Sequence, residues 1–154
     1  MLDALRVVDS PVLPAAVIRF TIPQLELPGV MGPAIEELMA VIGTQGISPA
    51  GPLFNHYLSM DGGVFDFEVG VPVSSPVAPA GRVAPGRLPA AKVMRTTYHG
   101  NYTGLHLAWR EFGDLGRAQG YLPAGGIWES YVYGPEANPD PSTWRTELNQ
   151  PVAE

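Results

Sequence analysis

The sequence of 154 residues contains no cysteine, which excludes disulfide bonds and thiolate metal sites. Basic residues are few: nine Lys and Arg stand against 15 Asp and Glu and leave a net charge of −6. Phosphate binding needs a basic face, so we expect no direct contact with nucleic acid. The N-terminus has no basic region followed by an apolar run, and no segment is long and apolar enough to span a bilayer. The composition therefore predicts a soluble, cytoplasmic protein without a membrane partner.

Several motifs of catalysis and cofactor binding are also missing. The glycines fall at expected turns and helix ends and form no phosphate-cradling loop, and no serine has the context of a nucleophile elbow. The three histidines have no ligand-type spacing, and we expect them at turns or on the surface: His56, His99 and His106. We predict neither a metal nor a cofactor.

Hydrophobic residues make up 45% of the chain and charged residues 16%, which suits a folded domain with a sizeable core. The 18 glycines and 17 prolines favour several short elements joined by turns. A chain of this length predicts a single domain, residues 1–154.

The chain contains one pattern twice. Residues 46–57 and 120–131 both read Gly-x-x-Pro-Ala-Gly-x-x-aromatic-x-x-Tyr. Two shorter motifs also recur, Leu-Pro-Ala-Ala from Leu13 and Leu88, and Glu-x-x-x-Pro-Val from Glu68 and Glu147. The offset between the copies is 74 or 75 at first and 79 in the last motif, so the second hairpin loop is five residues longer. We assign repeat 1 to about 12–73, an exposed linker to about 74–88 and repeat 2 to about 89–153.

Hydrophobic periodicity predicts the same elements in each copy. In the first, a helix begins at Pro33 and ends near Gly43, and in the second a helix follows Thr103 as N-cap. The predicted strands are 12–21, 53–59, 64–71, 92–98, 127–134 and 144–148, and residues 1–11 form a short lead-in. Two strand-helix-strand-strand units predict an α+β fold with pseudo-twofold symmetry, a mostly antiparallel sheet and both helices on one side. The junction of two such halves is a common place for a ligand pocket.

Glu129 is the sharpest candidate for chemistry, because the first copy has Asn55 at the equivalent position. Strand alternation places Glu129 and Tyr131 on one face with Tyr133 beside them, and Asn55 and Tyr57 on the matching face of the other half. A carboxylate among aromatic side chains suits a lipophilic cation, and with a pKa raised by burial it suits a general acid or base. The alternative is that Glu129 lies on a solvated sheet face and has no role.

The second half resembles the GyrI-like small-molecule-binding domain, which is also the effector-binding module of many AraC and MerR regulators and shares the SOUL-type fold. The motifs that carry the resemblance are Tyr98-His99-Gly100-Asn101-Tyr102, Gly120-Tyr121, Trp128-Glu129-x-Tyr131 and Thr146-Glu147-Leu148. The resemblance implies an aromatic pocket between the halves with a central glutamate, which corresponds to Glu129. We expect the other pocket residues to be Tyr131, Tyr57, Asn55, Tyr102 and Trp109. Two features depart from the family pattern, Asn101 where many members have proline and the long Pro/Ala linker.

Three functions remain open from the sequence. The first is a stand-alone protein that binds or senses small lipophilic molecules, in particular cations, without a DNA-binding domain, because ten leading residues cannot form a helix-turn-helix. The second is a hydrolase of cyclopropanoid DNA-alkylating natural products, which would use Glu129 with Tyr131 or Tyr57. The third is an interaction protein of the gyrase-inhibitor kind, with a regulator or gyrase as its partner.

Overall fold

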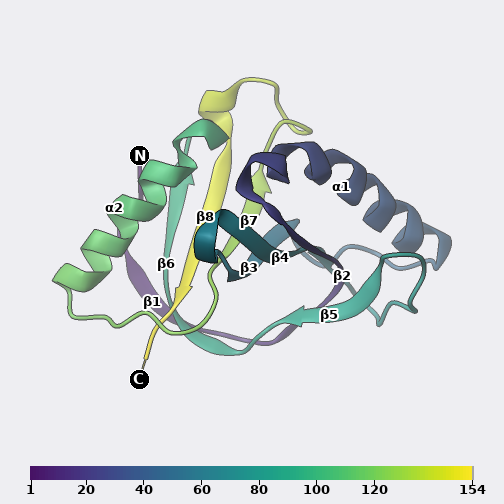
Figure 1. The fold of residues 1–154 in the computed structure, drawn as a ribbon, viewed down its shortest axis with the longest axis horizontal. Coiled ribbons are helices and arrows are strands. Elements are labelled where there is room, and N and C mark those ends of the chain that lie inside the picture. Colours follow the sequence, from purple (N-terminus) through teal and green to yellow (C-terminus); the bar gives the residue numbers. More distant parts are fainter. Residues whose placement is uncertain (154) are drawn as a thin grey trace. The chain divides into compact units, whose positions relative to one another are not determined.

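The computed structural model describes residues 1–153 and divides the chain into two compact units. One unit is Pro11–Ala90, and the other joins Met1–Ser10 to the chain from Ala91 onward. Each unit contains four antiparallel strands and one long helix (Figure 1). The α+β class and the duplicated strand-helix-strand-strand unit are therefore confirmed. None of the helices within residues 1–153 has the length and apolar character needed to cross a membrane.

The unit Pro11–Ala90 has the strand order β3-β4-β2-β5. Alternation along β2 and β4 places apolar side chains on one face, where Phe20 lies opposite Phe67 and Ile18 opposite Val69. Helix α1 contacts these two strands and buries one stripe of its surface, formed by Ala34, Leu38 and Ile42. Its elements are β2 (Leu13–Pro23), a 3₁₀ turn (Gln24–Glu26), α1 (Leu27–Thr44), β3 (Phe54–Ser59), a 3₁₀ turn (Asp61–Gly63), β4 (Val64–Pro72) and β5 (Ala84–Leu88).

The other unit has the strand order β1-β6-β8-β7. Its core lies between α2 and the sheet and contains five buried residues, Met94, Ala108, Phe112, Leu148 and Val152. Its elements are β1 (Arg6–Ser10), β6 (Ala91–His99), a 3₁₀ turn (Tyr102–Gly104), α2 (Leu105–Ala118), β7 (Trp128–Tyr133), a 3₁₀ turn (Pro141–Thr143) and β8 (Arg145–Pro151).

Both helices begin differently from the sequence prediction. Helix α1 starts at Leu27 with Pro28 in its first turn, so Pro33 lies inside the helix, where it removes one backbone donor. The start was misplaced because two prolines compete for the first turn, where proline costs nothing. Thr103 is not an N-cap either, because a 3₁₀ turn precedes α2 and the side chain of Asn101 accepts a hydrogen bond from the Thr103 N–H.

The segment expected to be an exposed linker is largely built into the fold. It contains strand β5, and Val77 and Val83 in it are buried. The side-chain amide of Gln45 holds the segment by both donating to the Ala78 carbonyl (2.9 Å) and accepting from the Ala78 N–H (2.8 Å). Pro85 and Gly86 concealed this strand, since neither residue favours a sheet.

The expected lead-in also forms a strand, β1, and the two unpredicted strands are exchanged between the repeats. β1 precedes β2 in the chain but pairs with β6, whereas β5 precedes β6 but pairs with β2. Each unit therefore takes its edge strand from the segment that leads into the other repeat.

Candidate ligand-binding site

Glu129 lies on β7 and is only 6% exposed. In the sheet register it lies directly opposite Leu148 of β8, and paired residues of antiparallel strands project from the same face. Leu148 belongs to the core that contains Phe112 of α2. Glu129 thus occupies the helix-covered face of the sheet, which rules out the alternative of a solvated side chain.

Two aromatic side chains donate hydrogen bonds to the Glu129 carboxylate. The indole Nε1–H of Trp109, on α2, donates to Oε1 at 2.8 Å, and the hydroxyl of Tyr131 donates to Oε2 at 2.9 Å. A carboxylate has about four acceptor sites, so each oxygen retains capacity for one more donor or cation. The two bonds orient the carboxylate and leave its charge uncompensated by any cation, since none of the ion pairs among residues 1–153 involves Glu129.

Burial raises the pKa of Glu129 above its ordinary value, because removal from water disfavours the charged form. The hydrogen bonds from Trp109 and Tyr131 act in the opposite direction and favour the carboxylate. This balance leaves a carboxyl group that a neighbouring positive charge would readily ionise.

An aromatic row extends from Tyr131. The ring of Tyr102 meets Tyr131 edge to face, with centroids 5.6 Å apart, and is tilted against Trp144 at 4.9 Å. The indole N–H of Trp144 is held by the Asn138 carbonyl at 2.8 Å. Burial, with smaller contributions from Glu136 and Glu129, raises the pKa of Tyr102 to about 12, so its phenol stays neutral.

The strand that carries Glu129 bends just after Tyr131. The register shifts between Tyr131, opposite Thr146, and Tyr133, opposite Arg145. Tyr133 therefore does not join Glu129 and Tyr131 as the alternation predicted, and its ring lies 5.3 Å from the Arg145 guanidinium. The same shift between Tyr57 and Ser59 shows that the repeat preserves this irregularity.

Thr146 is a member of the site that the sequence did not reveal. It is fully buried and lies opposite Tyr131 in the sheet, on the face of Glu129. Its hydroxyl has no hydrogen-bond partner within residues 1–153. A buried, unsatisfied hydroxyl is uncommon. Thr146 belongs to one of the motifs that carry the family resemblance, but no pattern assigned it to the site.

The equivalent position in the unit Pro11–Ala90 has the same local geometry with an amide. The Nδ2 of Asn55 donates to the Tyr57 hydroxyl at 3.1 Å and contacts the Met31 sulfur at 3.4 Å. Asn55 is fully buried, and its Oδ1 has no partner in the described part of the chain. Of the six predicted site residues, one unit brings together Glu129, Tyr131, Trp109 and Tyr102, and the other brings together Asn55 and Tyr57.

The histidines lie partly outside their predicted places. His106 is exposed and His99 pairs with Asp3 at 3.0 Å, but His56 is buried on β3, with Nδ1 3.9 Å from Glu68. Desolvation lowers the pKa of His56. No three His, Asp or Glu side chains within residues 1–153 are grouped so that they could hold a metal ion.

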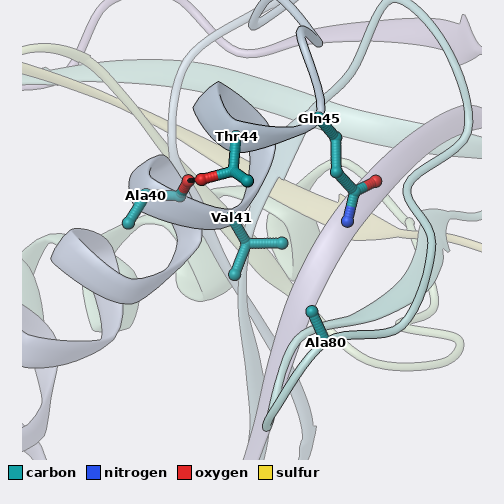
Figure 2. Close-up of a pocket in the computed structure, with 5 residues that line it drawn as sticks. All are labelled: Ala40, Val41, Thr44, Gln45 and Ala80. Atoms are coloured by element: carbon teal, nitrogen blue, oxygen red, sulfur yellow. Dashed lines mark hydrogen bonds between the residues drawn. The ribbon is translucent and has the colours of Figure 1, made fainter.

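A separate hollow of about 190 Å³ lies in the unit Pro11–Ala90, at the C-terminal end of α1 (Figure 2). It is lined by small or aliphatic side chains and one amide: Ala40, Val41, Thr44, Gln45 and Ala80. It contains neither aromatic nor charged residues, and none of the predicted site residues lines it.

The chain is a duplicated α+β domain with a buried carboxylate among aromatic side chains, an arrangement suited to a small organic ligand. The chain belongs to the GyrI-like small molecule binding domain family, whose model matches residues 4–153. No protein of curated function matches the chain by sequence.

Solved structures share the fold. The EcmrR C-terminal domain superposes with a TM-score of 0.86 at 21% identity, over 98% of both chains. This chain also superposes on the EcmrR chain of the EcmrR–DNA complex, with a TM-score of 0.85 at 21% identity. The match covers 98% of this chain but only 57% of that EcmrR chain. SAV2435 bound to tetraphenylphosphonium superposes with a TM-score of 0.72 at 15% identity, over 98% of this chain and 94% of the SAV2435 chain. A hydrolase from Listeria innocua superposes with a TM-score of 0.69 at 13% identity, over 97% of this chain and 91% of the hydrolase chain. At these identities the likeness establishes the fold alone.

Proposed function

We propose that the chain binds small lipophilic cations and that Glu129 supplies the negative charge. The observation that carries the proposal is a carboxylate only 6% exposed and oriented by the Trp109 and Tyr131 donors. None of the ion pairs within residues 1–153 gives it a cationic side chain as partner. An uncompensated buried charge is costly, so a site of this kind gains free energy when a cation enters.

The surroundings of Glu129 favour an organic cation over a hydrated metal ion. The neighbouring rings of Trp109, Tyr131 and Tyr102 offer apolar area and negative ring faces, which attract cations with dispersed charge. The ligand of the structural relative SAV2435, tetraphenylphosphonium, is a cation of this class. As a binding module, the protein would sequester such compounds or present them to a partner.

Tetraphenylphosphonium is also the probe for the test, by calorimetric titration of the wild type and Glu129→Gln. Glutamine preserves the shape and both contacts, because its carbonyl accepts from Trp109 and its amide donates to the Tyr131 oxygen. Loss of the charge should weaken binding by about 1–3 kcal/mol, or roughly five- to 150-fold.

Glu111→Gln is the matched control, since Glu111 is an exposed carboxylate on α2 and its replacement changes the net charge equally. We expect this variant to bind like the wild type. Equal affinity of the wild type and Glu129→Gln for the phosphonium would refute the role of Glu129.

Hydrolysis of a cyclopropanoid alkylating agent is the second candidate, favoured by the pairing of a buried carboxyl with the Tyr131 phenol. Glu129 would accept a proton from water as the water oxygen bonds to a ring carbon. The ring C–C bond would break, and its electron pair would move into the conjugated carbonyl of the substrate. Mass spectrometry of the compound after incubation decides this, because an enzyme yields a water-added product with the wild type and none with Glu129→Gln.

A further inference from the structure

The two repeats differ in two ways near one site. Glu129 replaces the amide of Asn55, and the second hairpin loop is five residues longer than the first. The short hairpin turns through Asp61–Gly63, whereas the long loop contains Glu136 before β8 begins at Arg145. The extra residues are the part of the repeat pattern that the proposed function does not use.

The long loop is held by its own hydrogen bonds. The Ala137 and Asn138 N–H groups donate to the Gly134 carbonyl at 3.0 and 3.2 Å, and the Asp140 N–H donates to the Asn138 side chain at 2.9 Å. The Asn138 carbonyl in turn accepts from the Trp144 indole. This network fixes the Trp144 ring where it packs on Tyr102.

Glu136 and Tyr102 converge where the loop leaves β7. A Cβ atom on Gly134 would lie 2.6 Å from the Tyr102 hydroxyl oxygen and 3.1 Å from Oε2 of Glu136. Only a residue without a side chain leaves this space to both groups. The outer carboxylate therefore lies at the end of the same aromatic row that begins at Glu129, running through Tyr131 and Tyr102.

The two carboxylates have different surroundings. Glu129 is buried against α2, whereas Glu136 is exposed on the loop. We infer that the site selects dicationic lipophiles, with one positive centre at Glu129 and the second, across an apolar spacer, at Glu136 beside Tyr102 and Trp144. This inference rests on the proposed function and names the charge pattern of the ligand. An exposed ion pair and a cation over aromatic rings each contribute a modest amount, which suits selectivity more than raw affinity.

The experiment compares bis(triphenylphosphonium) alkanes of pentyl, octyl and decyl spacer with the singly charged alkyl triphenylphosphonium of equal length. The wild type should bind at least one dication more tightly than its matched monocation. Glu136→Gln should weaken binding of the dication by about two- to fivefold, as expected for an exposed ion pair, and leave the affinity for the monocation unchanged. Glu136→Lys should bind the dication more weakly than the matched monocation. In the wild type, added salt should reduce the affinity advantage of the dication over the monocation.

Two negative results are distinguishable. If the monocation binds in a Glu129-dependent manner but the dications show no advantage, or if Glu136→Gln weakens both ligands equally, the dication inference is overturned and the proposed function stands. If neither ligand binds, or Glu129→Gln leaves both affinities unchanged, the proposed function itself fails.

Discussion

Cation binding at Glu129 should be coupled to proton release. Burial raises the pKa of this carboxyl above the ordinary 4.5, and a bound cation favours the ionised form. Below the raised pKa of the free protein, the ligand must displace the proton. Affinity should therefore fall by about tenfold, or 1.4 kcal/mol, for each pH unit below that pKa, and level off above it.

Titration calorimetry of tetraphenylphosphonium between about pH 4.5 and 8, in two buffers of different ionisation enthalpy, measures both affinity and released protons. We expect close to one proton released at the acidic end and none at the alkaline end. The Glu129→Gln variant should show a flat profile. It retains His56, whose pKa is lowered by burial, so the difference between the two proteins isolates Glu129.

The reasoning would be refuted by a binding constant that depends on Glu129 but not on pH, with no proton release in either buffer. That result would mean that the free protein already carries an ionised Glu129 throughout the range, with the Trp109 and Tyr131 donors outweighing burial.

Two further predictions concern the unliganded protein. The folded-state pKa of Glu129 is raised, so the contribution of this group to stability is fully present below its unfolded pKa and is lost as pH rises through the folded pKa. Glutamine does not ionise, so Glu129→Gln should gain stability relative to the wild type as pH rises over that range. Urea unfolding at several pH values tests this, and parallel profiles of the two proteins would contradict it. Gln45→Ala should lose about 1–2 kcal/mol and speed hydrogen exchange of the Ala78 amide, because two hydrogen bonds to Ala78 disappear. Gln119→Ala, at the equivalent end of α2, is the control and should leave the Ala78 amide protected.

The sequence predicted Glu129 because duplication provides an internal reference, so that one carboxylate in place of Asn55 stands out. Strand alternation then correctly placed Tyr131 with Glu129. It failed two residues further on, since a register shift that no residue type signals turns Tyr133 toward Arg145.

Other parts of the site depend on contacts that no local pattern encodes. The sequence predicted that Trp144 begins a strand, but the position of its ring beside Tyr102 follows from the hydrogen bonds of the loop. The sequence placed Thr146 in a strand without a further role, and only the register of β7 and β8 shows it opposite Tyr131. Strand β5 was missed because Pro85 and Gly86 oppose strand propensity, and pairing with β2 overrides them.

The exchange of edge strands has a consequence for biosynthesis. During translation, repeat 1 emerges first but cannot complete its sheet until β5, residues 84–88, has also left the ribosome. Strand β1 must wait longer, since its partner β6 begins at Ala91. Such distant pairings slow folding and leave open strand edges in the interval. For the same reason, a fragment of residues 1–73 would lack β5, the partner of its β2, and a fragment that begins at residue 89 would lack β1, the partner of its β6.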